Sequence, residues 1–217
     1  MSSLKKSMIL NFIIFILVLL GTIFMMTGFQ FMGKTQLLSS TGISPFKFYT
    51  VDSNIIVGLS SLILFIYEYL ALKDKINIVP KFAYIFKYIG VVGVSLTFLV
   101  TLFYLAPLYG SKFIFLYKNS NLIFHLIVPV LSFISFILYE NNHLSFKHTF
   151  YGISTMIIYG IYYSINIWVH QENGVVPITY DWYSFVRGGV LEIFIVFPII
   201  LIITYLIALF IYRLERR

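Results

Sequence analysis

Six long apolar runs divide this sequence, and each approximates the ~20 residues that an α-helix needs to cross the hydrocarbon core of a bilayer. The predicted spans are residues 8–26, 50–70, 82–105, 121–139, 150–168 and 189–212. No linker rich in Pro, Ser or Gly and no low-complexity segment interrupts them. The sequence therefore predicts an all-α integral membrane protein, with a single bundle of six transmembrane helices in one domain that covers residues 1–217.

Composition supports this class. Hydrophobic residues make up 60% of the chain and charged residues only 11%, which is too few charges to coat a soluble protein of this size. The chain has no cysteine, so disulfides, thiolate zinc sites and a cysteine nucleophile are excluded. Its four histidines are scattered without the spacing of a metal-binding helix. We therefore expect neither a metal nor a cofactor.

The first apolar run could be read as a signal peptide, because Lys5 and Lys6 precede it. However, the run is longer than the ~7–15 apolar residues of a signal peptide, and no small-x-small cleavage site follows it. We expect it to be the first helix of the bundle.

The basic residues predict an orientation. With the N-terminus inside, ten of the 15 Lys and Arg residues fall on the cytoplasmic side: Lys5, Lys6, Lys73, Lys75, Lys81, Lys87, Lys147, Arg213, Arg216 and Arg217. This bias places both termini in the cytoplasm. The net charge of +7 then reflects contact with anionic lipid, and nucleic acid is not an expected partner. Near the inner end of the second span, we expect Glu68 to reach water or to pair with Lys73 or Lys75.

With this topology, the outer ends of several spans and the adjoining loops carry polar side chains. Such groups are costly at that depth unless they find partners, so they form a candidate functional site. The candidate residues are Thr50, Asp52, Ser53, Asn54, Asn121, His125, Asp181, Arg187 and Glu192.

Two local arrangements fit these residues. Because positions three and four apart share a helix face, Thr50, Ser53 and Asn54 can form one stripe. Alternatively, Ser53 and Ser120 are N-caps of their helices, and Thr50 lies in the loop before the helix. Pro129 and Pro198 are expected to kink the fourth and sixth helices.

The motifs resemble the androgen-induced protein family, which has a large bacterial branch. The resemblance rests on Tyr-Thr-x-x-Ser-Asn at residues 49–54, Asn-x-x-x-His-x-x-x-Pro at residues 121–129 and Tyr-Asp-Trp-Tyr-Ser-Phe at residues 180–185, and it covers nearly the whole chain. Animal members are multi-pass threonine hydrolases that cleave fatty acid esters of hydroxy fatty acids with an essential Thr and an essential His. By motif, the resemblance implies Thr50 and His125 as the catalytic residues, in a bacterial plasma membrane.

The chemistry can also be argued from the residues. A threonine hydroxyl is a weak nucleophile that needs a base within hydrogen-bond reach, and His125 is the candidate base. Three carboxylates compete to orient its imidazole: Asp52, Asp181 and Glu192. Donors to an acyl oxyanion could be Ser53, Asn54, Asn121 or Arg187. Asp181 and Arg187 could instead clip the last outer loop together.

These residues predict an intramembrane lipid esterase whose site lies near the non-cytoplasmic leaflet and whose substrate is a membrane lipid or acyl ester. The alternative is a non-enzymatic transporter or ligand-binding protein that uses the same polar cluster. A transporter favours interrupted helices with polar groups near the bilayer midplane. The cluster lies near one end of the spans instead, which favours the esterase.

Overall fold

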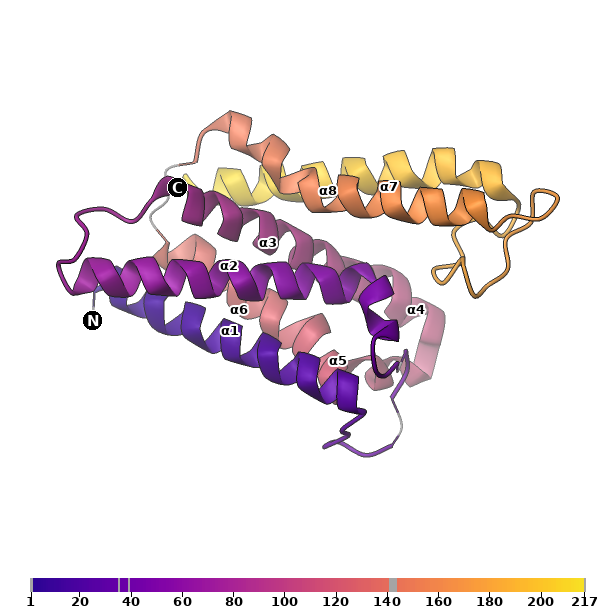
Figure 1. The fold of residues 1–217 in the computed structure, drawn as a ribbon, viewed down its shortest axis with the longest axis horizontal. Helices are drawn as coiled ribbons and strands as arrows, with labels where there is room; N and C mark the ends of the chain where they lie inside the picture. The colour runs from indigo at the N-terminus through magenta and orange to yellow at the C-terminus, as the bar shows by residue number, and fades with distance from the viewer. Residues whose placement is uncertain (1, 35, 39, 141–143, 217) are drawn as a thin grey trace.

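The computed structural model describes residues 2–34, 36–38, 40–140 and 144–216 (Figure 1). Within these residues there is no β-strand, and an isolated bridge pairs Glu172 with Val175. By length and composition, six helical spans of the described chain can cross a membrane: Ser3–Thr27, Tyr49–Leu72, Lys81–Tyr117, Ser120–Tyr139, Phe146–Val169 and Val190–Glu215. The predicted all-α bundle of six transmembrane helices is confirmed.

Some spans consist of several helical segments. The first two are α1 (Ser3–Thr27) and α2 (Tyr49–Leu72), and the short η1 (Ser44–Lys47) precedes α2. The third contains α3 (Lys81–Val100), η2 (Thr101–Leu105), α4 (Ala106–Tyr109) and η3 (Gly110–Tyr117). The fourth contains α5 (Ser120–Leu122), η4 (Ile123–Ile127) and α6 (Val128–Tyr139). The last two contain η5 (Phe146–Ile153) with α7 (Ser154–Val169), and η6 (Val190–Glu192) with α8 (Ile193–Glu215).

Helix α3 lies at the centre of the bundle. It contacts α2, α6, η5 and α8, and in Figure 1 it runs between the group formed by α1, α2 and α6 and the pair formed by α7 and α8. Its Tyr88, Val91, Val92 and Val94 are fully buried. The hydrophobic core is therefore organised around α3, while many apolar side chains of the other helices face outward, as expected for contact with lipid.

Glycines allow the first helices to approach closely. A Cβ added at Gly90 of α3 would lie 2.7 Å from the backbone Cα of Val57 on α2, and one added at Gly58 would lie 2.7 Å from the side chain of Val18 on α1. Small residues at helix contacts are typical of membrane bundles, where close van der Waals packing holds helices together.

Two π-helical segments interrupt the third and fourth spans, each just before a proline. Segment η2 ends two residues before Pro107, and η4 ends two residues before Pro129. Proline lacks the N–H that continues an α-helical hydrogen-bond ladder, and a π-helical turn accommodates this gap. The irregularity expected at Pro129 thus takes the form of a π-helical segment. Pro198 lies inside α8, which runs on to Glu215.

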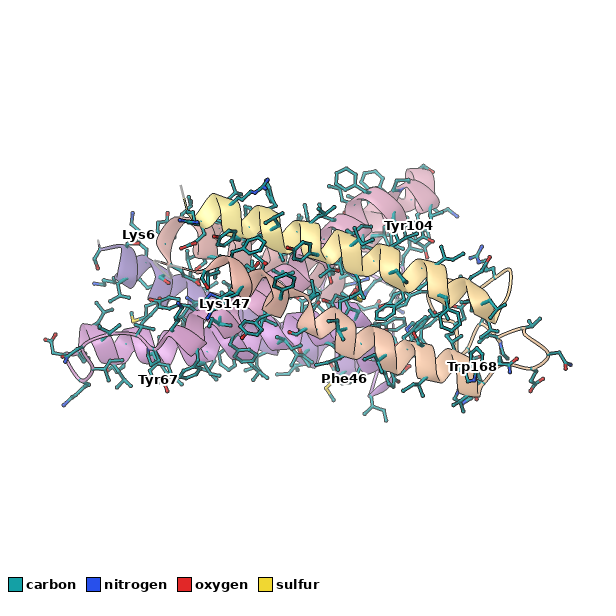
Figure 2. The ribbon with its side chains drawn as sticks, turned by 90° about the horizontal axis from the view of Figure 1, so that it is seen from above. Lys6, Phe46, Tyr67, Tyr104, Lys147 and Trp168 are labelled. Atoms are coloured by element: carbon teal, nitrogen blue, oxygen red, sulfur yellow. The ribbon has the colours of Figure 1, made fainter. Side chains whose placement is uncertain are left out.

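Both termini lie at the same end of the bundle (Figure 1), as six spans require. Figure 2 shows Lys6 and Tyr67 toward this end and Tyr104 and Trp168 toward the other. Lys87, one of the basic residues counted for the cytoplasmic side, is fully buried inside the bundle.

The expectation for Glu68 is wrong. Its side chain is fully buried and accepts a hydrogen bond from the hydroxyl of Ser7 on α1. It does not extend to water, because α1 packs against the end of α2 at this position.

Candidate functional site

Asn54 connects the start of α2 to the segment that carries His125. Its side-chain amide donates to the carbonyl of Thr50 at 2.7 Å and to the carbonyl of Phe124, in η4, at 3.2 Å. Asn54 is fully buried. Because Thr50 lies four residues before Asn54, the two share a helix face, and Thr50 lies on the side of α2 that meets η4.

The first of the two local arrangements is the observed one. Helix α2 begins at Tyr49, so Thr50 and Ser53 are both inside it, and Phe48 occupies the N-cap position. Ser120 is the first residue of α5, and Asn119 occupies the N-cap position. The alternative with Ser53 and Ser120 as N-caps is wrong.

His125 lies in the middle of the π-helical segment η4 and is 4% exposed. Its Nδ1 lies 2.9 Å from the carbonyl oxygen of Leu116. A carbonyl oxygen can only accept, so Nδ1 carries the hydrogen, and in the neutral ring Nε2 is left as the acceptor. This bond therefore selects the tautomer in which Nε2 can accept a proton, as a general base must.

The orienting group is thus the backbone carbonyl of Leu116 at the end of η3. The sequence could not indicate it, because every residue carries a carbonyl and only the fold brings this one to the imidazole. The sequence indicates this contact only through the short separation of nine residues between Leu116 and His125.

The three carboxylates proposed to orient the imidazole of His125 either bind other groups or face another side of their helix. Asp181 accepts from the hydroxyl of Tyr163 and from the backbone N–H groups of Phe185, at 2.9 Å, and Val186, at 3.1 Å. These hydrogen bonds hold the loop around Asp181 in place. Arg187, which was proposed to hold this loop together with Asp181, is exposed. Glu192 accepts from the backbone N–H of Gly188 at 2.9 Å.

Asp52 faces a different side of α2. At ~100° per residue, Asp52 lies about 200° around the helix from Thr50. It borders a cavity of about 360 Å³ between α2 and α7, whose lining is mainly apolar. The lining residues are Tyr49, Asp52, Ile55, Ile56, Thr155, Ile158, Tyr159 and Tyr162.

The polar groups suggested as oxyanion donors mostly hold the backbone. Ser53 contacts the carbonyl of Thr50 and the hydroxyl of Thr97, each at 3.1 Å. Asn54 uses its amide for the two carbonyls described above, and Asn121 donates to the carbonyl of Leu37 at 2.7 Å. These contacts give Ser53, Asn54 and Asn121 a positioning role.

The loop before the last span lies over the start of α2. The backbone N–H of Tyr49 donates to the hydroxyl of Tyr183 at 2.8 Å, and the hydroxyl of Tyr159 donates to the carbonyl of Lys47 at 2.7 Å. The indole of Trp182 in turn donates to Tyr159 at 3.0 Å. Burial raises the pKa of Tyr183 to about 12, so its hydroxyl stays protonated near neutral pH.

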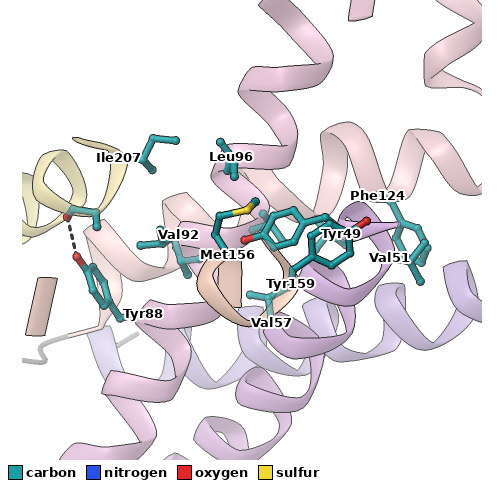
Figure 3. Close-up of a cluster of buried hydrophobic side chains, with 14 of the residues drawn as sticks. Tyr49, Val51, Val57, Tyr88, Val92, Leu96, Phe124, Met156, Tyr159 and Ile207 are labelled. Atoms are coloured by element: carbon teal, nitrogen blue, oxygen red, sulfur yellow. Dashed lines mark hydrogen bonds between the residues drawn. The ribbon is translucent and has the colours of Figure 1, made fainter. Parts of the chain in front are cut away.

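Figure 3 shows the ring of Tyr49 beside that of Tyr159, and their centroids are 5.3 Å apart. Tyr159 and Tyr163 are four residues apart on α7, so they share one helix face, and this spacing was the sign in the sequence that the face meets the loop.

Within the described part of the chain, no three His, Asp or Glu side chains converge in a way that could hold a metal ion. Searches with protein-family models, curated proteins and solved structures found no match to this chain.

Proposed function

We propose that this protein is an intramembrane lipid esterase with Thr50 as the nucleophile and His125 as the general base. The observation that carries the proposal is the bond from Nδ1 of His125 to the carbonyl of Leu116, which leaves Nε2 as a buried proton acceptor. The bridge through Asn54 supports it, because it holds the Thr50 face of α2 against the segment that contains His125.

The reaction proceeds in two steps. In the first, the Thr50 hydroxyl attacks the ester carbonyl while Nε2 of His125 accepts its proton, and the imidazolium then protonates the departing alcohol. In the second, His125 takes a proton from water, which attacks the acyl-threonine. The imidazolium then returns this proton to the Thr50 oxygen as the bond to the acyl carbon breaks, which releases the fatty acid and restores the Thr50 hydroxyl and neutral His125. The carbonyl of Leu116 stabilises the imidazolium in both steps.

The resemblance of the motifs to the androgen-induced protein family supports the same two residues and an acyl ester substrate. Thr50 lies in the first turn of α2, at the end of the bundle away from both termini. With the termini in the cytoplasm of a bacterial cell, the site faces the outer leaflet of the plasma membrane, and its substrate is a membrane lipid or acyl ester.

The test is labelling of the purified protein with a fluorophosphonate probe, followed by mass spectrometry of the labelled peptide. The proposal expects the adduct on Thr50, loss of labelling in Thr50→Ala and His125→Ala, and full labelling in the control Thr22→Ala, whose hydroxyl donates to the carbonyl of Val18 at 2.8 Å. An adduct on another residue, or no adduct on a protein that hydrolyses esters, contradicts the assignment.

The cavity beside Asp52 favours a second candidate, a non-enzymatic transporter or ligand-binding protein. A half-buried carboxylate at the edge of an apolar cavity suits a ligand with a cationic or hydrogen-bond-donating head and an apolar body. For this candidate, Asp52→Asn abolishes ligand binding and Thr50→Ala leaves it intact. If the protein is an esterase, Thr50→Ala should instead abolish ester hydrolysis, and Asp52→Asn should affect it less.

A further inference from the structure

The cavity between α2 and α7 lies away from both ends of the fifth span. Its lining on α7 runs from Thr155 to Tyr162, in the middle part of the span Phe146–Val169. Figure 1 shows α7 extending beyond the start of α2, so the first turn of α2, which carries Asp52, lies beside this middle part. A carboxylate at this depth of a membrane-spanning bundle is costly unless it has a partner, and it marks a candidate binding site.

The cavity opens sideways, toward the lipid. Its inner wall is formed by Tyr49 and Tyr159, which are buried, whereas Ile158 at its edge is 70% exposed and Tyr162 is 51% exposed. Exposed apolar side chains on a membrane-spanning helix face the acyl chains of the bilayer. A ligand can therefore reach Asp52 from the bilayer without passing through the bundle.

Asp52 has no positive partner in the described part of the chain. Its carboxylate forms neither a hydrogen bond nor an ion pair with the described residues. Lys47, the nearest basic residue in the sequence, instead places its ammonium over the rings of Phe48 and Trp182, 5.4 Å and 5.3 Å from their centroids. The position of Asp52 in the first turn of α2 favours its ionised form. The carboxylate can therefore accept a cation from outside the protein.

Three hydroxyl groups of the lining bind within the protein. Those of Tyr49 and Thr155 lie 2.9 Å apart in a hydrogen bond, and that of Tyr159 donates to the carbonyl of Lys47 at 2.7 Å. None of the lining residues is basic. A negatively charged head would meet the carboxylate of Asp52 without a cation to balance it, so the cavity favours a positively charged head.

The tyrosines indicate the kind of cation. The cavity is lined by Tyr49, Tyr159 and Tyr162, and aromatic rings attract cations, with quaternary ammonium groups as the best-known ligands of aromatic-lined sites. A primary ammonium brings three N–H donors that need acceptors, whereas a quaternary ammonium brings none. Its methyl groups also suit the isoleucines of the lining.

We propose that this cavity binds a membrane amphiphile with a quaternary ammonium head, which lies against Asp52 while its apolar chain extends between α2 and α7 into the bilayer. The volume of about 360 Å³ is at the lower end of the ~300–1,000 Å³ of ligand pockets, so it holds the head and the start of the chain. The proposal rests on the second candidate function, ligand binding beside Asp52, and it narrows the ligand to one chemical class. It is independent of hydrolysis at Thr50.

The test is equilibrium binding of radiolabelled dodecyltrimethylammonium to the full-length protein in dodecyl maltoside, a neutral detergent. We expect saturable binding of one probe per protein, which unlabelled probe displaces and which dodecanol and dodecyl phosphate, with the same chain, do not. Asp52→Asn should weaken binding about tenfold. The control Asp74→Asn, the same substitution at an exposed residue, should leave it unchanged. Thr50→Ala should bind the probe normally even if it no longer hydrolyses esters.

The proposal is overturned if the wild-type protein shows no saturable binding, or if Asp52→Asn binds as tightly as the wild type. Equal displacement by dodecanol would assign the cavity to a neutral ligand, and equal displacement by free tetramethylammonium would assign it to a soluble one. Either result refutes the proposed amphiphile but leaves the ligand-binding candidate standing. The wild-type displacement series decides the question even if Asp52→Asn does not fold.

Discussion

The side-chain amide of Asn54 donates to the backbone carbonyl of Phe124 across the interface between α2 and η4, at 3.2 Å. The same amide donates to the carbonyl of Thr50. A single buried side chain thus holds the first turn of α2 against the π-helical segment of His125. If Thr50 and His125 act together, the distance and orientation between their side chains depend on Asn54.

Replacing Asn54 tests this dependence. Asn54→Leu leaves the carbonyl of Phe124 buried without its donor, and an unsatisfied buried polar group costs about 1–3 kcal/mol. We expect lower thermal stability and a large loss of ester hydrolysis. The control Asn166→Leu removes a surface hydrogen bond to the carbonyl of Tyr180 and should change neither quantity much. Unchanged stability in Asn54→Leu would show that the bridge does not hold the two segments together.

The topology can be tested with single cysteines, because the chain has none of its own. Ser111 and Asn77 are both exposed, at opposite ends of the bundle. With cytoplasmic termini, Ser111→Cys should react with an impermeant maleimide in intact cells, and Asn77→Cys should react only after lysis. The opposite pattern would move the proposed ester site to the cytoplasmic leaflet.

Much of the fold was predictable because the bilayer itself dictates it. A span must be apolar over ~20 residues, so runs such as 8–26 and 121–139 reveal helices without any knowledge of packing. The helical continuation of the third span to Tyr117 was not predicted, since residues 106–117 include Pro107, Gly110 and polar side chains that favour a loop.

The candidate site was predictable only in part. The polar residues of the first turns of α2 and of η4 could be singled out because they interrupt apolar runs. The role of Leu116 could not, because its contribution is a backbone carbonyl. The burial of Glu68 against Ser7 of α1 was missed because the two residues are far apart in sequence, and a charged residue near the end of a span ordinarily extends to water.

The contact between α2 and α3 should be sensitive to a single methyl group. In Gly90→Ala, the new Cβ would meet the backbone of Val57 at 2.7 Å, and backbone cannot move without shifting a helix. In Gly93→Ala, the nearest atoms belong to side chains, at 3.1 Å for Ser53 and 3.2 Å for Tyr49. We expect Gly90→Ala to lower the thermal midpoint clearly more than Gly93→Ala. Equal effects of the two substitutions would contradict the close approach at Gly90.

The esterase should also respond to acid. A protonated imidazole cannot accept the Thr50 proton, so the rate should fall at low pH as His125 takes up a proton. The measurement is a pH profile of kcat/KM for a long-chain ester, with the fold monitored in parallel. His170→Ala serves as the control, because that ring stacks on Tyr180 in a loop, and it should leave the acid limb unchanged. A rate that stays constant in acid while the fold is intact would exclude a histidine base.

The most direct test of the central claim is the rate of long-chain ester hydrolysis by purified Thr50→Ala, His125→Ala and the double variant, each checked for folding and membrane insertion. A nucleophile and its base act as one unit, so either single substitution should abolish hydrolysis nearly as completely as both together. Thr50→Ser, which keeps the hydroxyl, should retain part of the rate. If Thr50→Ala hydrolyses the ester at the wild-type rate, Thr50 is not the nucleophile and the proposed function is wrong.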